Sequence, residues 1–155
     1  NKDIQFLIYG DGNQKEMLEK RILDEGISNI KMKGFVNKKN IPYILSKSSV
    51  NILNYSQTQY NWSRGNSSNK LFEYMASGKP IISTVKMGYS IIDKYNCGIE
   101  LEDGSPEDLA DTILKIKNMP TNEYDELGSN AKKGAEDFDF NVLTDRLIEV
   151  INSLN

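Results

Sequence analysis

Short apolar runs alternate with longer amphipathic segments along most of this chain of 155 residues. Most of the runs are nearly continuous, which is typical of strands that are buried on both faces of a sheet. We expect these strands at 4–9, 30–36, 50–53, 80–83 and 98–101. Because segments with helical spacing separate the strands, the sequence predicts an α/β fold, a Rossmann-like parallel sheet with helices on both faces.

Helices are expected around 17–23, 40–46, 69–77 and 89–95, and three more follow the last strand. The first of these three begins at Ser105-Pro106-Glu107-Asp108, which combines an N-cap residue, a first-position proline and acidic residues in the first turn. The others are expected near 123–138 and 142–154. Since parallel crossovers are right-handed, all strands end at one edge of the sheet, where ligands of such sheets bind.

Composition excludes several kinds of chemistry. The chain has no histidine, which removes Ser-His and Cys-His nucleophile pairs and nearly all zinc catalysis. Its one cysteine, Cys97, excludes a disulfide framework, fits a reducing compartment and is interpreted as a small buried structural residue. A net charge of -3 argues against nucleic acid as a partner, and no apolar stretch is long enough to span a membrane.

A phosphate would have to be held with few arginines, because only Arg21, Arg64 and Arg146 are arginine among the 19 basic residues. Bidentate anion clamps are therefore nearly unavailable, and backbone N–H groups or lysine must take their place.

The first candidate for such a site is the turn Gly10-Asp11-Gly12 after the first strand. A dinucleotide fingerprint needs a third glycine where this chain has Lys15. Two interpretations stay open: a turn that a ligand approaches, or a tight turn in which Asp11 or Asn13 caps the following helix.

The second candidate is the segment 67–80, where small polar residues give way to a short helix at the mouth of the predicted crevice. Ser68 or Asn69 can cap this helix, which leaves the N–H groups of its first turn pointing outward. Those amides and the positive end of the helix dipole suit a phosphate.

Glu73 is an acid among the apolar residues of the same helix. Burying a carboxylate without a partner is costly, so Glu73 must find donors. It can form a surface ion pair with Lys70, three residues earlier. Alternatively, it accepts two hydroxyls of a ribose, as acidic residues do in nucleotide-binding α/β folds.

Four motifs stand in a recognisable order: Leu7-Ile8-Tyr9-Gly10-Asp11-Gly12, Lys33-Gly34-Phe35-Val36, Asn69-Lys70-Leu71-Phe72-Glu73-Tyr74-Met75-Ala76-Ser77-Gly78-Lys79-Pro80 and Cys97-Gly98-Ile99. Their order and spacing resemble the donor-binding half of GT-B glycosyltransferases of family 4, a group that includes many bacterial polysaccharide and lipopolysaccharide sugar transferases. The resemblance covers nearly the whole chain. It implies a single nucleotide-sugar-binding domain over 1–155, the C-terminal half of a GT-B fold lacking its first strand, from a larger two-domain enzyme.

The resemblance also implies roles for residues. The donor-binding residues would be Gly10, Gly12, Phe35, Val36, Asn69, Lys70, Leu71 and Glu73. Glu73 would bind the ribose hydroxyls of a nucleotide diphosphate sugar, and amides near Lys70 would hold the diphosphate. The two glycines would let the backbone approach the ligand, and the backbone of Phe35 and Val36 would contact the base. No catalytic side chain is assigned.

For the whole enzyme, the resemblance implies a retaining glycosyltransferase in bacterial cell-surface polysaccharide synthesis, located in the cytoplasm and using no metal or further cofactor. Its partners would be the donor, an N-terminal acceptor-binding domain that this chain lacks and, for a lipid-linked acceptor, the membrane surface. A basic pair of Arg and Lys would lie before Asn1. The chain alone is expected to bind a nucleoside diphosphate weakly without turnover.

One departure from the family pattern leaves alternatives open. The family often has a second glutamate eight residues before the position of Glu73, where this chain has Gly65. Asn66, Arg64 or Tyr60 from the aperiodic loop could substitute for it. A degenerate, binding-only domain and a non-catalytic flavodoxin-like module are the alternative interpretations.

Overall fold

The computed structural model describes residues 3–56, 61–65 and 68–154. Its chain forms two compact units, Asn1–Ile41 and Pro42–Asn155, and each is described by itself.

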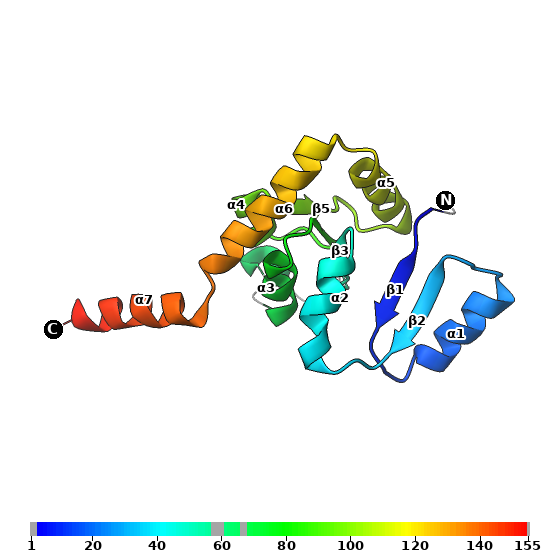
Figure 1. Cartoon of the computed structure of the whole chain (residues 1–155), viewed down its shortest axis with the longest axis horizontal. Coiled ribbons are helices and arrows are strands. Elements are labelled where there is room, and N and C mark those ends of the chain that lie inside the picture. The colour runs from blue at the N-terminus through cyan, green and yellow to red at the C-terminus, as the bar shows by residue number, and fades with distance from the viewer. Residues whose placement is uncertain (1–2, 57–60, 66–67, 155) are drawn as a thin grey trace. The chain divides into compact units, whose positions relative to one another are not determined.

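The first unit is a βαβ motif, drawn in blue and cyan in Figure 1. Strand β1 (Phe6–Tyr9) pairs in parallel with β2 (Ile30–Gly34), and helix α1 (Lys15–Asp24) connects them. The prediction of a buried first strand is wrong: none of the described residues 3–41 is buried. The physical reason is that a single helix and a two-stranded sheet leave most of the apolar surface of β1 uncovered.

The beginning of α1 also differs from the prediction. Its N-cap is Gln14, whose side chain makes no capping hydrogen bond. The carboxylate of Asp11 instead accepts the N–H of Gly12 at 2.9 Å. The interpretation in which Asp11 or Asn13 caps the helix is therefore wrong, because the turn continues beyond both residues before the helix starts.

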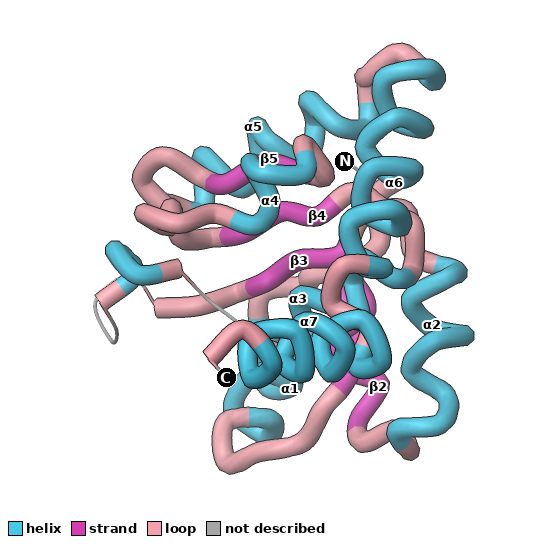
Figure 2. The backbone as a smooth tube through the Cα atoms, turned by 90° about the vertical axis from the view of Figure 1, so that its left-hand side faces the viewer, coloured by secondary structure: helices cyan, strands magenta, loops and turns pink. Residues whose placement is uncertain are grey.

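The second unit is built on a three-stranded parallel sheet in the order β3-β4-β5. Its strands are β3 (Asn51–Leu53), β4 (Ile81–Ser83) and β5 (Gly98–Glu100), which lie side by side in Figure 2. Helix α2 (Ile41–Lys47) precedes β3, and the connections between the strands hold α3 (Asn69–Ala76) and α4 (Ile91–Tyr95), as the helical spacing predicts.

Three helices follow the last strand: α5 (Pro106–Lys117), α6 (Thr121–Glu136) and α7 (Phe140–Asn152). The predicted start of α5 is confirmed, since the Ser105 hydroxyl accepts the N–H of Asp108 at 3.0 Å. In Figure 1, α7 extends away from α6. Apolar side chains of α7 such as Leu147 and Ile151 are exposed. None of the helices in the described ranges is long and apolar enough to cross a bilayer.

The core of this unit occupies both faces of its sheet. One cluster joins the sheet to α3, α4 and α6 and consists of Leu53, Leu71, Met75, Ile81, Ile92, Cys97 and Ala131. The other joins it to α5 through Ile82, Leu101 and Ile116. The predicted parallel sheet with helices on both faces is confirmed.

Cys97 is fully buried in the first of these clusters, as predicted. Its thiol donates to the carbonyl of Ile92 at 3.6 Å. Burial raises the pKa of this thiol to about 12, so it stays protonated at neutral pH and is a poor nucleophile. Cys97 is therefore a packing residue.

Candidate functional site

The site is built where β3 and β4 end. Tyr55 follows β3 and Thr84 follows β4, and the N–H of Tyr55 donates to the Thr84 hydroxyl at 2.8 Å. The same hydroxyl donates to the Tyr55 carbonyl at 3.0 Å. These bonds tie the two strand ends together at the edge of the sheet where parallel α/β folds bind ligands.

Helix α3 begins at this edge. Its N-cap is Ser68, in extended conformation, and the Ser68 side chain makes no capping bond. Its hydroxyl instead lies 2.6 Å from the hydroxyl of Tyr55. Leu71 and Met75 point into the core, whereas Asn69 and Lys70 are exposed. The buried stripe thus holds the helix on the sheet and leaves its opening turn accessible.

The predicted first-turn residues of α3 are Asn69, Lys70 and Leu71. The N–H of Leu71 donates to the carbonyl of Ser68 at 3.0 Å, so that amide already has a protein partner. The amides of Asn69 and Lys70 belong to the first turn, which an α-helix leaves without intrahelical acceptors. The assignment of a diphosphate to these amides stays a prediction.

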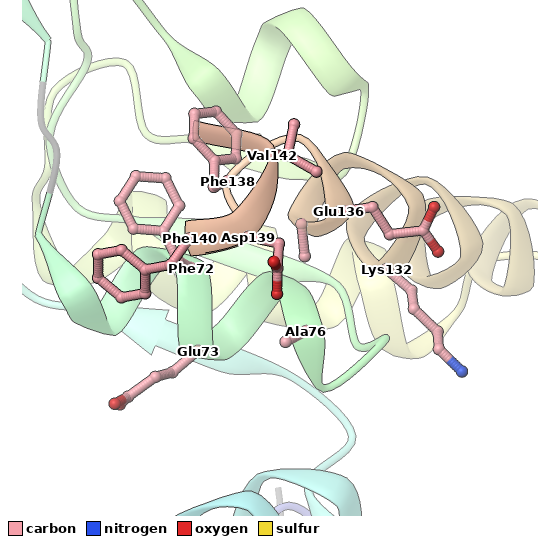
Figure 3. A pocket seen from close by; sticks show the side chains of 10 residues that line it. Phe72, Glu73, Ala76, Lys132, Glu136, Phe138, Asp139, Phe140 and Val142 are labelled. Carbon is pink, nitrogen blue, oxygen red and sulfur yellow. The ribbon is translucent and has the colours of Figure 1, made fainter. Parts of the chain in front are cut away.

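Glu73 lies on α3 and is half-buried. In Figure 3 its carboxylate points away from the rings of Phe72 and Phe138. The alternative of an ion pair with Lys70 is wrong, since no ion pair joins these two residues in the part of the chain that the structure describes. The carboxylate is therefore available to an external donor such as a ribose hydroxyl.

A groove of about 580 Å³ adjoins Glu73 between α3, α6 and the start of α7. It is lined by Phe72, Glu73, Ala76, Lys132, Ala135, Glu136, Phe138, Asp139, Phe140 and Val142. Phe72 and Phe138 pack with their ring centroids 4.5 Å apart. Apolar walls with three carboxylates and one lysine repel a diphosphate, so this groove is not the phosphate cradle.

The sequence reasoning missed a wall of the site, which is formed by the 3₁₀ turn Trp62–Arg64. The 3₁₀ turn Trp62–Arg64 lies against the segment after β4, and the N–H of Gly88 donates to the Trp62 carbonyl at 3.0 Å. The Trp62 indole donates to the carbonyl of Ser56 at 3.0 Å, and its ring packs on Tyr55 at 5.1 Å between centroids. Sequence reasoning found only an aperiodic loop here, because these contacts join distant segments.

Gly65 closes this turn with φ of 78°, which is left-handed backbone. A Cβ there would lie 2.5 Å from the carbonyl oxygen of Tyr89, closer than two atoms can approach. The glycine is thus required by packing. Of the predicted substitutes for a glutamate at this position, Arg64 is exposed in the turn, while Tyr60 and Asn66 lie outside the described residues.

Glu100 is a buried acid that the sequence reasoning did not single out. Its carboxylate accepts the N–H of Met87 at 3.1 Å and the hydroxyl of Ser90 at 2.8 Å. Burial raises the pKa of this carboxyl, and the two hydrogen bonds oppose that effect. The signal was present in the sequence, since an acid inside an apolar strand demands donors as Glu73 does.

In the first unit, the predicted donor-binding residues lie at the carboxyl ends of both strands. The N–H of Gly10 donates to the Gly34 carbonyl at 2.8 Å, which brings the turn with Gly12 next to the turn with Phe35 and Val36. Phe35 is 78% exposed. A polar hollow of about 530 Å³ adjoins Gly12 and Lys15. The predicted residues of this unit thus share one edge.

Within the ranges described, no cluster of three or more histidine, cysteine, aspartate or glutamate side chains is arranged to hold a metal ion.

Comparison with known proteins decides the family. The sequence model described as "Glycosyl transferases group 1" matches residues 1–134. This chain belongs to that family. The flavodoxin-like alternative is set aside by this match. No curated protein sequence matches the chain.

Solved structures of low identity share the fold of this family member. HepE of Anabaena, in complex with UDP, aligns with a TM-score of 0.70 at 19% identity over 99% of this chain and 42% of its own. TarM of S. aureus, also crystallised with UDP, gives 0.73 at 23% over 98% and 30%. WaaG, described as involved in lipopolysaccharide biosynthesis, gives 0.67 at 19% over 95% and 38%. The chain therefore spans about two fifths or less of these proteins' lengths.

Proposed function

We propose that this chain is the domain of a retaining glycosyltransferase that binds the nucleotide diphosphate sugar donor. The observation that carries the proposal is the opening of α3 at the carboxyl edge of the sheet. Within the described part of the chain, Glu73, the fifth residue of this helix, makes no ion pair with Lys70. Membership in the glycosyltransferase family and the fold shared with UDP-bound HepE support it.

In the proposed complex, the N–H groups of the first turn of α3 hold the diphosphate, and the positive end of the helix dipole offsets its charge. Glu73 accepts the two ribose hydroxyls. When the sugar leaves, negative charge grows on the diphosphate, and fixed amides that already point at it stabilise that charge without reorganising. The proposal uses no metal ion and no cofactor beyond the donor.

The proposal extends to the whole enzyme. A separate acceptor-binding domain would complete the cleft, and the chain alone would bind donor without transferring sugar. The class of acceptor would be a bacterial cell-surface polysaccharide or lipopolysaccharide, which the description of WaaG supports. Such synthesis would take place in the cytoplasm, with a lipid-linked acceptor bringing the enzyme to the membrane surface.

The experiment titrates the chain with UDP, GDP and 2′-deoxy-UDP by calorimetry. We expect Glu73→Ala to weaken UDP binding by about tenfold to a hundredfold, the loss typical of a hydrogen bond to a charged group. Because Glu73 is assigned to the ribose, the wild type should prefer UDP over 2′-deoxy-UDP and the variant should lose that preference.

Glu136→Ala is the matched control, since Glu136 lies on the same groove but faces it from α6. It should leave both affinities unchanged. Equal discrimination between UDP and 2′-deoxy-UDP in wild type and Glu73→Ala would remove the ribose assignment. Appreciable sugar transfer from UDP-glucose by the chain alone would overturn the claim that a second domain is needed.

A further inference from the structure

Among the residues that the structure describes, Glu100 is the only charged side chain that is buried. It stands on β5, and no ion pair within the described ranges reaches it. A buried carboxylate without a counter-ion depends on hydrogen-bond donors. Both donors come from one segment, the N–H of Met87 on Oε2 and the hydroxyl of Ser90 on Oε1.

These two bonds fasten the segment 87–90 at both of its ends. The Ser90 hydroxyl oxygen also accepts the N–H of Asp93 at 3.0 Å, so Glu100 orients the residue that caps α4. Glu100 thus determines where the segment between β4 and α4 lies over the edge of the sheet.

The segment 87–90 packs directly against the 3₁₀ turn Trp62–Arg64. The backbones of the segment and of the turn are in direct contact. A Cβ on Gly88 would lie 2.3 Å from the Ser63 carbonyl oxygen, and a Cβ on Gly65 would lie 2.5 Å from the Tyr89 carbonyl oxygen. The hydrogen bond from Gly88 N–H to the Trp62 carbonyl fixes the same contact. A shift of the segment must therefore shift the turn.

The turn is connected to the start of α3 through Tyr55. Trp62 packs on the ring of Tyr55, and the Tyr55 hydroxyl lies 2.6 Å from the hydroxyl of Ser68, the N-cap of α3. The described contacts are thus continuous from Glu100 to the helix opening where the donor's diphosphate is proposed to bind.

We propose that Glu100 is a positioning residue of the donor site, which sets the wall formed by the Trp62–Arg64 turn beside the first turn of α3 through its two hydrogen bonds to the segment 87–90. The inference rests on the proposed donor-binding function. It also accounts for Gly65: the wall at this position is packed backbone, which leaves no room for a side chain to reach the donor.

The test compares three variants of the chain. Glu100→Leu removes both hydrogen bonds at nearly constant volume. Glu100→Gln keeps both, because its carbonyl accepts from Met87 and its amide donates to Ser90. Glu102→Leu is the control, since Glu102 is an exposed neighbouring acid paired with Lys86. The readouts are calorimetric UDP affinity and the fluorescence of Trp62, the only tryptophan in the chain.

We expect Glu100→Leu to weaken UDP binding about tenfold and to shift the Trp62 emission to longer wavelength. Glu100→Gln and Glu102→Leu should match the wild type in both readouts. Unchanged UDP affinity in Glu100→Leu overturns the proposal. So does an equal loss in Glu100→Gln, because the charge and not the positioning would then be responsible.

Gly88→Ala disrupts the contact between the segment 87–90 and the Trp62–Arg64 turn directly. It keeps the proposal testable if Glu100→Leu fails to fold. It should also lower UDP affinity and change the Trp62 emission, and wild-type behaviour in it overturns the proposal. If the wild type itself fails to bind UDP, the proposed function fails. An unchanged Trp62 emission in Glu100→Leu would then still overturn the positioning role separately.

Discussion

The strands of the two units are similarly apolar but very differently buried. In β1, Leu7 and Ile8 are 47% and 42% exposed, whereas Ile81 and Ile82 of β4 are fully buried. The strand β4 has a partner along each edge and helices over both faces, while β1 has one partner and one helix. An apolar run therefore determines that a strand forms, but its burial depends on what surrounds it.

The largest difference is expected from truncating one isoleucine in each unit. Ile82→Ala should cost about 2–5 kcal/mol of unfolding free energy, because it leaves a cavity in a closed core. Ile8→Ala should cost less than about 1 kcal/mol, since its side chain is already partly in water. Native-state hydrogen exchange measures each unit separately. Equal losses in the two units would show that β1 is as well packed as β4.

A glycine pair gives a smaller effect. A Cβ on Gly98 would lie 2.0 Å from the Ile81 carbonyl oxygen, whereas one on Gly12 would meet nothing within 4 Å. Gly98→Ala should cost about 3 kcal/mol by forcing β5 away from β4. Gly12→Ala should change stability by less than about 1 kcal/mol. If Gly12 contacts the donor, as the family resemblance implies, Gly12→Ala lowers UDP affinity while the hydrogen-exchange protection of the first unit stays normal.

The smallest effect concerns two helix caps. The Ser105 hydroxyl accepts a backbone N–H of α5, whereas Gln14 of α1 makes no side-chain cap. Ser105→Ala should cost about 1 kcal/mol and Gln14→Ala only a few tenths. Thermal unfolding by circular dichroism, with Ser105→Thr as a conservative replacement, checks the difference. A similar loss from both alanine variants would mean that the caps do not distinguish the two helices.

Local signals predicted the elements of the fold well. The N-cap serine and proline before α5, the stripe of Leu71 and Met75 in α3, and the glycine that ends α3 all act within one or two helical turns, so a linear sequence displays them. The helix α1 was predicted correctly, but its capping residue was not, because the helix begins after both Asp11 and Asn13, with Gln14 as its N-cap.

The candidate site was predicted only in part. Glu73 and the opening of α3 lie within a few residues of each other, and their chemistry is readable without tertiary contacts. The wall formed by the Trp62–Arg64 turn was not predictable, because it depends on hydrogen bonds from Gly88 to Trp62 and from Met87 to Glu100, which join segments that only folding brings together.

The sequence by itself determined the alternation of strands and helices, the absence of histidine chemistry and the glutamate within the short helix α3, since each depends on residue type and local spacing. The tertiary structure alone decided which apolar strand is buried, why position 65 is glycine and which acid holds the loop after β4. Those properties depend on atoms that lie far apart along the chain and come within van der Waals or hydrogen-bond distance only in the folded molecule.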